Sequence, residues 1–267
     1  MSEDSSISPY SLIADFDGNV EELFNIQLDK DVLPIIPLRN MAIFPGIVVP
    51  VAIERQFSIS VIRKAMKEGS YIGAVTQKKP ETDEPEKDDI YDIGTIVKVI
   101  RILELPQGRI TALLQGFCRF CITDIAKSHG IYKATFLPVY EKNISDSDKE
   151  FSAIIGSIKD QTKALIDLDE NHTEESNFAI SNIKNNIFLL NFVCTNIGFK
   201  TEEKIDILRE TDPKERAMKL LTVLNTQVQL AILKANIQRK TRADLDQQQK
   251  EYFLQQEIRN IQEELGD

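Results

Sequence analysis

The chain of 267 residues is 42% hydrophobic and 28% charged, which is typical of a globular protein of one to three domains. No apolar run approaches the roughly 20 residues of a membrane-spanning helix, and the N-terminus lacks the basic and apolar regions of a signal peptide. The formal net charge of −10 argues against a dominant nucleic-acid-binding surface, because neutralising phosphates requires clustered lysine and arginine. We therefore expect a cytoplasmic protein without membrane contact.

The first 31 residues are rich in serine and aspartate, and they predict a flexible arm with at most one short helix. Residues 32–141 then predict a β-rich domain. It opens with Leu33–Arg39, whose two prolines are typical of an edge strand. A run of β-branched residues over 47–53 follows as the second strand.

One short helix interrupts these strands. Ser58 is suited to cap it, Ile62 and Met66 recur at helical spacing, and Gly69 favours its end. Several short strands around one helix predict a compact, curved sheet or a partly open barrel. The remaining predicted strands cover 71–76, 94–103, 109–117, 118–125 and 132–139, and an acidic loop covers 77–92.

Residues 142–211 change to a helical period and predict a small bundle. Apolar residues line one face of a first helix near 151–166 and of a second near 180–197, which Gly198 ends. Thr201 begins a third, shorter helix.

The last segment, 212–267, predicts one long helix. Asp212 can cap it, Pro213 fits its first position, and Glu215 completes a capping box. Without glycine or proline before Gly266, it would reach on the order of 75–80 Å at about 1.5 Å per residue. Its apolar seam fades in the middle and returns near the end, which is typical of a helix that projects from the body or pairs with a partner.

The residues give little sign of covalent chemistry. No phosphate-binding loop pattern occurs, which argues against a P-loop ATPase within this sequence. Cys118 and Cys121 have the spacing of metal sites, but residues three apart on a strand point to opposite faces, so ordinary strand residues are the favoured interpretation. A nucleophilic pair of Cys194 and His172 is weaker still, because Cys194 lies on an apolar helix face. We predict no catalytic, cofactor or metal site in this chain.

Three motifs occur in the same order as in a known family. They are LPIIPLRN over 33–40 followed by FPG over 44–46, then GFCRF over 116–120, and finally QKEYFLQQEIRNIQEELG over 249–266. Together they resemble the N-terminal region of bacterial ATP-dependent Lon proteases. The last motif is the most specific, because it resembles the helix that precedes the Lon ATPase module.

The resemblance implies an α+β fold: a PUA-like β-domain, a helical bundle, and a long helix that leads towards an AAA+ ring. It also implies a parent enzyme that is a homohexameric serine protease, uses ATP and Mg²⁺, and has a Ser–Lys dyad outside this chain. The chain itself would recognise unfolded or damaged proteins. Weak DNA contact is implied for the parent only.

Unfolded clients expose apolar segments that folded proteins bury. We therefore predict client contacts from two loops of the β-domain and from the long helix. The aromatic pair on that helix also fits an alternative, which is packing against a neighbouring helix. The predicted contact residues are Met41, Phe44, Glu54, Arg55, Phe57, Tyr252 and Phe253.

Three other functions remain open. The first is a free-standing interaction module that dimerises through the long helix. The second, a small-molecule site like that of ubiquitin-ligase receptors with a Lon-like domain, is disfavoured because those sites resemble a tryptophan cage and this chain has no tryptophan. The third is an RNA-binding PUA-type domain, which the acidic balance disfavours, although a basic stretch over 234–242 could touch nucleic acid.

Overall fold

The computed structural model describes residues 24–26, 28, 31–128, 130–142, 144, 148–168 and 174–266. The strands are β1 (Val32–Leu38), β2 (Val48–Ile53), β3 (Tyr71–Gln77), β4 (Ile90–Glu104), β5 (Ile110–Ser128) and β6 (Ile131–Val139). The helices are α2 (Gln56–Glu68), α3 (Lys149–Asp167), α4 (Glu174–Asn182), α5 (Asn186–Asn196), α6 (Thr201–Arg209) and α7 (Pro213–Leu265).

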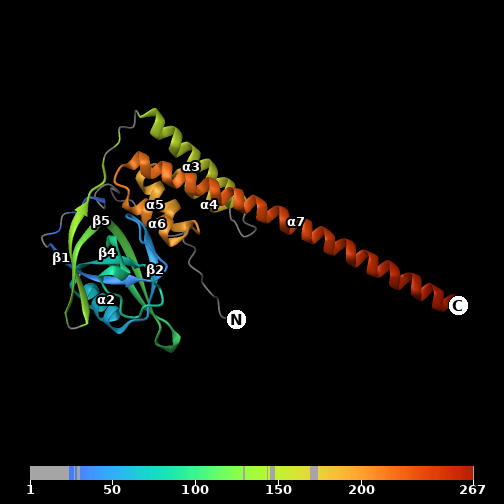
Figure 1. The fold of residues 1–267 in the computed structure, drawn as a ribbon, viewed down its shortest axis with the longest axis horizontal. Coiled ribbons are helices and arrows are strands. Elements are labelled where there is room, and N and C mark those ends of the chain that lie inside the picture. The colour runs from blue at the N-terminus through green and yellow to red at the C-terminus, as the bar shows by residue number, and fades with distance from the viewer. Residues whose placement is uncertain are drawn as a thin grey trace.

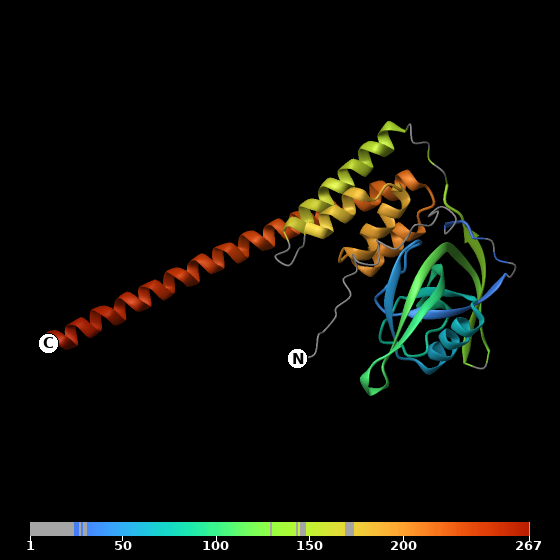
Figure 2. The same ribbon diagram turned by 180° about the vertical axis from the view of Figure 1, so that it is seen from behind.

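The molecule has a curved six-stranded sheet at one end, with α3 to α6 packed beside it and α7 projecting far beyond both (Figure 1). The reverse view shows the same arrangement, with the C-terminal end of α7 remote from every other element (Figure 2). The predicted α+β architecture is therefore confirmed.

The strand order is β2-β5-β4-β3-β1-β6, and β6 also pairs with β5. This second pairing closes five strands into a ring. Strand β5 makes the closure feasible because its 19 residues serve two neighbours on one side: Ile110–Gln115 pair with β2, and Arg119–Ser128 pair with β6.

The prediction that the proline-rich first strand lies at an edge is wrong, because β1 has a partner on each side. Residues 32–35 pair with β6, whereas 35–38 pair with β3. Pro34 and Pro37 therefore each lie in a half of the strand that has a ladder on one side only. A missing backbone N–H is tolerated there, because it can face the side without a ladder.

The predicted cap of the short helix is also wrong. Helix α2 begins at Gln56 with Arg55 as its N-cap, and Ser58 lies buried on its inner face. Met66, predicted on the apolar face, is 42% exposed, while Ile62 is buried as expected. Gly69 does end the helix, in the left-handed conformation that glycine adopts without strain.

The predicted helix over 180–197 is two helices, α4 and α5. The side chain of Asn185 accepts a hydrogen bond from the Phe188 N–H at 2.8 Å and so caps a new helix. The ammonium of Lys159 donates to the carbonyl of Ile183 at 3.1 Å, which satisfies a backbone group exposed by the break. Side-chain hydrogen bonds therefore compensate for the interruption.

Helix α7 begins as predicted, because the Asp212 side chain accepts from the backbone N–H groups of Lys214 and Glu215. The Asp212 N–H itself donates to the side chain of Glu210 at 3.1 Å, and Glu215 is not its partner. The capping box is thus replaced by a contact with the preceding residues. Gly266 ends the helix in the left-handed conformation.

One apolar core extends from the sheet into the helices. Phe44 and Ile62 of the β-region belong to the same buried cluster as Leu190 of α5 and Leu220 of α7. Phe24, from the segment predicted as a flexible arm, is 2% exposed and joins this cluster as well. The rest of that predicted arm lies outside the described residues, apart from 25, 26, 28 and 31.

Candidate functional site

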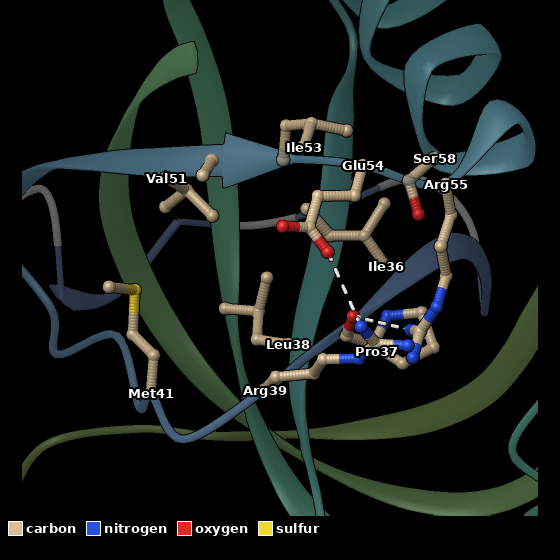
Figure 3. A pocket seen from close by; sticks show the side chains of 11 residues that line it. Ile36, Pro37, Leu38, Arg39, Met41, Val51, Ile53, Glu54, Arg55 and Ser58 are labelled. Atoms are coloured by element: carbon tan, nitrogen blue, oxygen red, sulfur yellow. Dashed lines mark hydrogen bonds and ion pairs between the residues drawn. The ribbon is translucent and has the colours of Figure 1, made fainter. Parts of the chain in front are cut away.

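The first candidate site is a pocket of about 210 Å³ at the ends of β1 and β2. Figure 3 shows Ile36, Leu38, Val51 and Ile53 forming its floor, with Met41 entering from one side and polar groups gathered opposite. The floor belongs to two strands that do not pair with each other. The pocket therefore has an apolar floor and a polar edge, as small binding sites commonly do.

Buried polar contacts fix the loop that carries Met41. The Thr76 hydroxyl donates to the Met41 carbonyl at 2.8 Å, and the Thr95 hydroxyl donates to the Ile43 carbonyl at 2.5 Å. From the helical region, Asn191 donates to the Pro45 carbonyl at 3.0 Å. Because buried hydrogen bonds of this kind hold the backbone in one conformation, Met41 sits on a preformed loop.

Gly116 of β5 holds the other end of this loop. It exchanges two backbone hydrogen bonds of 2.9 Å with Gly46 and Ile47. A Cβ atom on Gly116 would lie 2.3 Å from the carbonyl oxygen of Phe44. Only glycine permits this approach, which explains a residue that sequence inspection placed in a motif without a structural role.

Two arginines form the polar edge of the pocket. The guanidinium of Arg39 contacts Glu54 at 3.3 Å and Asp83 at 2.5 Å. The guanidinium of Arg55 donates to the Pro37 carbonyl at 3.2 Å and to the Gln77 side chain at 2.5 Å. Burial, followed by the charge of Arg39, lowers the pKa of Arg55 below its usual value.

The Nε–H groups of both Arg39 and Arg55 are buried without a hydrogen-bond partner. The two arginines are otherwise balanced by Glu54 and Asp83, so the edge combines hydrogen-bond donors with little net charge. The polar edge therefore carries little net charge beside an apolar floor.

The structure brings together three of the predicted contact residues, Met41, Glu54 and Arg55, which all line the pocket. Phe44 lies in the core and is 0% exposed, which leaves it no surface for a client. Phe57 packs on Tyr132 with ring centroids 5.1 Å apart and lies outside the pocket lining.

Tyr252 and Phe253 lie on the projecting part of α7, at 59% and 69% exposure. From Asn236 to Glu263, every side chain that the structure describes is exposed. The alternative in which they pack on a helix therefore finds no partner among the described residues. The buried part of α7 ends at Val228, after Ala217, Leu220 and Leu224.

A buried ion cluster joins the sheet to α7, and sequence analysis missed it. The carboxylate of Glu141 lies 3.1 Å from Nε of Arg119 on β5 and 2.9 Å from Nη1 of Arg216 on α7. All three side chains are at most 5% exposed. Arg119 also donates to the carbonyls of Leu208 and Glu210, at 2.7 and 2.6 Å, where α6 ends.

The members of this cluster come from three separate segments, and its contact with α7 lies at Arg216, near the start of that helix. Burial, and then the charge of Arg216, lower the pKa of Arg119 to about 10. A charged residue between Phe117 and Phe120 within an apolar strand was the available signal, since buried charges require partners. Its partners are 22 and 97 residues away along the sequence, so they could not be identified from spacing.

The cysteines show no sign of activation. Burial raises the pKa of the Cys118 thiol and of the Cys194 thiol to about 12, and it also raises the pKa of the Cys121 thiol. His172, proposed as a partner of Cys194, lies outside the described residues. In the part of the chain that the structure describes, no three His, Cys, Asp or Glu side chains are grouped to hold a metal, and no helix could cross a membrane.

The comparison with protein families decides the affiliation of the chain. Residues 32–226 match the family described as the ATP-dependent protease La (Lon) substrate-binding domain. The chain belongs to this family. The matched range covers the strands, the helices α2 to α6 and most of the buried part of α7.

Curated relatives agree with this assignment. The Lon protease of Flavobacterium johnsoniae is 42% identical over 92% of this chain, and that of Porphyromonas gingivalis is 38% identical over 92%. The chain spans only about 30% of the length of each relative. It therefore corresponds to the N-terminal part of a Lon protease.

Solved structures support the fold. The N-terminal domain of a Mycobacterium avium complex Lon protease has a TM-score of 0.58 at 18% identity and covers 73% of this chain and 98% of its own. A Lon N-terminal domain protein from Xanthomonas campestris has a TM-score of 0.52 at 14% identity, and the match covers 72% of this chain and 97% of that protein's chain. At such identities the likeness establishes the Lon N-terminal fold alone.

Proposed function

We propose that the chain is the substrate-recognition and spacer region of an ATP-dependent serine protease that degrades misfolded and short-lived regulatory proteins. In this proposal the chain binds polypeptide and carries no catalytic residue. ATP, Mg²⁺ and the proteolytic dyad act elsewhere in the parent enzyme. Support comes from the substrate-binding family that the chain belongs to and from relatives that are Lon proteases over a greater length.

The observation that carries the proposal is apolar side chains that reach solvent in two places. Met41 is partly exposed on a hydrogen-bonded loop above a pocket floor that is itself at most 5% exposed, and α7 presents an aromatic pair to solvent. Exposed apolar patches on otherwise polar surfaces mark interaction sites. Apolar segments, which folded proteins bury, are what distinguishes an unfolded client.

The length and the anchoring of α7 support the spacer role. Its 53 residues reach roughly 80 Å at about 1.5 Å per residue. In this proposal the ion cluster around Glu141 holds α7 in one direction relative to the sheet. In a hexamer, six copies of a weak site would raise the apparent affinity through local concentration.

The test compares a folded protein with its permanently unfolded variant on immobilised chain. We expect selective retention of the unfolded form, and a reduction of at least several-fold in the Met41→Asp and Tyr252→Ala/Phe253→Ala variants. Gln248→Ala/Gln249→Ala is the matched control, because both glutamines are exposed on the same helix. If the unaltered chain retained neither the folded nor the unfolded form, the proposal would be contradicted.

A second candidate function is self-association through the end of α7. The exposed residues Leu254, Ile258 and Ile261 recur at spacings of four and three, which is typical of a coiled-coil seam. Sedimentation equilibrium tests this candidate directly. A concentration-dependent mass that Ile258→Asp abolishes would favour it, and a monomer at all concentrations would exclude it.

A further inference from the structure

Strands β1 and β3 separate at one end. Their parallel pairing runs from Ile35 opposite Gly73 to Leu38 opposite Thr76. The preceding residues, 32–34 of β1 and 71–72 at the start of β3, have no partner across the gap. Each of these stretches keeps its ladder on the far side, with β6 and β4 respectively. Two strand edges therefore face each other without pairing.

A cavity of about 690 Å³ lies in this gap. Helix α2 covers it with Val61 and Ala65, and β3 and β6 contribute Ile72 and Ile131. This volume lies within the range of roughly 300–1,000 Å³ that is usual for ligand-binding cavities. It lies at the opposite end of β1 from the pocket at Met41, so the two cavities are separate.

The rim of the cavity carries one excess positive charge among its described lining residues. Lys64 of α2 and Lys133 of β6 line it and are exposed, and Glu68 is the acidic residue among its described lining. Lys64 and Glu68 lie 3.9 Å apart, which leaves Lys133 as the excess positive charge. A ligand that complements this rim carries a carboxylate beside an apolar group.

We propose that this cavity, here called the β1–β3 cleft, binds a short extended client segment whose apolar side chains are flanked by a carboxylate. Unpaired strand edges accept an added strand through main-chain hydrogen bonds, while neighbouring pockets select the side chains. Pro34 lacks an N–H, and the N–H of Ser70 already donates to the Ala65 carbonyl at 3.0 Å, so neither residue offers a donor to the added strand. This proposal specifies which kind of client segment the cleft selects, and it rests on the proposed client-binding function.

The probe is a fluorescein-labelled, unstructured octapeptide in which valine and phenylalanine alternate with serine and aspartate, followed by anisotropy at low salt. The variant is Lys64→Glu/Lys133→Glu. The control is Lys67→Glu, which is exposed on the same helix but absent from the lining. Reversing both charges turns the rim from net positive to net negative, so it should weaken binding of the acidic peptide roughly ten-fold, whereas the control should leave it unchanged.

A second peptide tests the main-chain pairing. The same octapeptide with methylated backbone nitrogens at alternate residues keeps its side chains but loses N–H donors. We expect at least a roughly ten-fold loss of affinity. Unchanged affinity of the methylated peptide, or equal affinity of the Lys64→Glu/Lys133→Glu variant and the unaltered chain, would overturn the cleft.

Retention of the permanently unfolded protein separates this proposal from the general function. If the cleft variant retains that protein fully and binds the octapeptide as tightly as the unaltered chain, the cleft is refuted while client binding stands. If the unaltered chain retains no unfolded protein and binds no octapeptide, both proposals fail. Loss of octapeptide binding in the cleft variant, with unfolded protein still held through Met41, supports the cleft.

Discussion

Replacing Glu141 by glutamine should destabilise the fold more than any exposed charge change. The carboxylate of Glu141 is 5% exposed and lies within 3.1 Å of two arginines that are themselves at most 1% exposed. Glutamine preserves the size of the side chain but removes its charge. Two buried guanidinium groups would then remain without a counter-ion.

The magnitude follows from the partners that each arginine keeps. Breaking a buried ion pair costs about 3–5 kcal/mol, because an uncompensated charge stays in the protein interior. Arg119 still has two backbone carbonyls as acceptors, at 2.7 and 2.6 Å, so most of the loss falls on Arg216. We expect Glu141→Gln to lower the free energy of unfolding by about 3 kcal/mol, the lower end of that range.

The assay is urea unfolding followed by far-UV circular dichroism, since the chain has no tryptophan for fluorescence. Glu54→Gln is the matched control, because Glu54 pairs with Arg39 at 3.3 Å but is 74% exposed. Exposed pairs contribute about 0–1 kcal/mol, so this variant should unfold almost as the unaltered chain does. Similar small losses for both variants would refute the burial argument.

A triple replacement distinguishes stability from positioning. Arg119→Met/Glu141→Leu/Arg216→Met exchanges the charges for apolar groups, which is often neutral or stabilising in proteins. We expect it to recover most of the stability lost in Glu141→Gln. If the charges fix the direction of α7, small-angle scattering should show a broader range of shapes in the triple variant.

Three further results are expected. Burial raises the pKa of Cys118 and Cys194 to about 12, so iodoacetamide at about pH 8 should modify them only after unfolding, as mass spectrometry would show. Above about pH 9 the unfolded chain releases these thiol protons while the folded chain keeps them. Both thiols therefore stabilise the fold fully below about pH 9 and less at about pH 10. Comparing the urea midpoints of Cys194→Ala and the unaltered chain at the two pH values would reveal this loss. Gly116→Ala should lower the free energy of unfolding by about 1–3 kcal/mol, because the new methyl group clashes with the Phe44 carbonyl. Gly156→Ala should raise it by up to about 1 kcal/mol, because Gly156 of α3 has open space around it. Thermal melts in which Gly156→Ala is the less stable variant would contradict this.

The sequence by itself determined the local elements of this protein. Runs of β-branched residues indicated strands, and spacing by three and four indicated helices, including the long helix that begins after Asp212. The strands predicted over 109–117 and 118–125 are one strand, β5, and the helix predicted over 180–197 is two. Its motifs also indicated the Lon family, which the family comparison confirmed. These features depend on residues that are close in the sequence, so the sequence alone is enough to predict them.

Only the tertiary structure decided which residues meet. It showed that β1 is paired on both sides, that Phe44 is core while Met41 and Arg55 share a pocket, and that the segment at Phe24 joins the buried cluster. It also brought Glu141 to two arginines from distant segments. Contacts of this kind depend on how strands close and helices dock, because burial and pairing are properties of the whole chain and not of any local pattern.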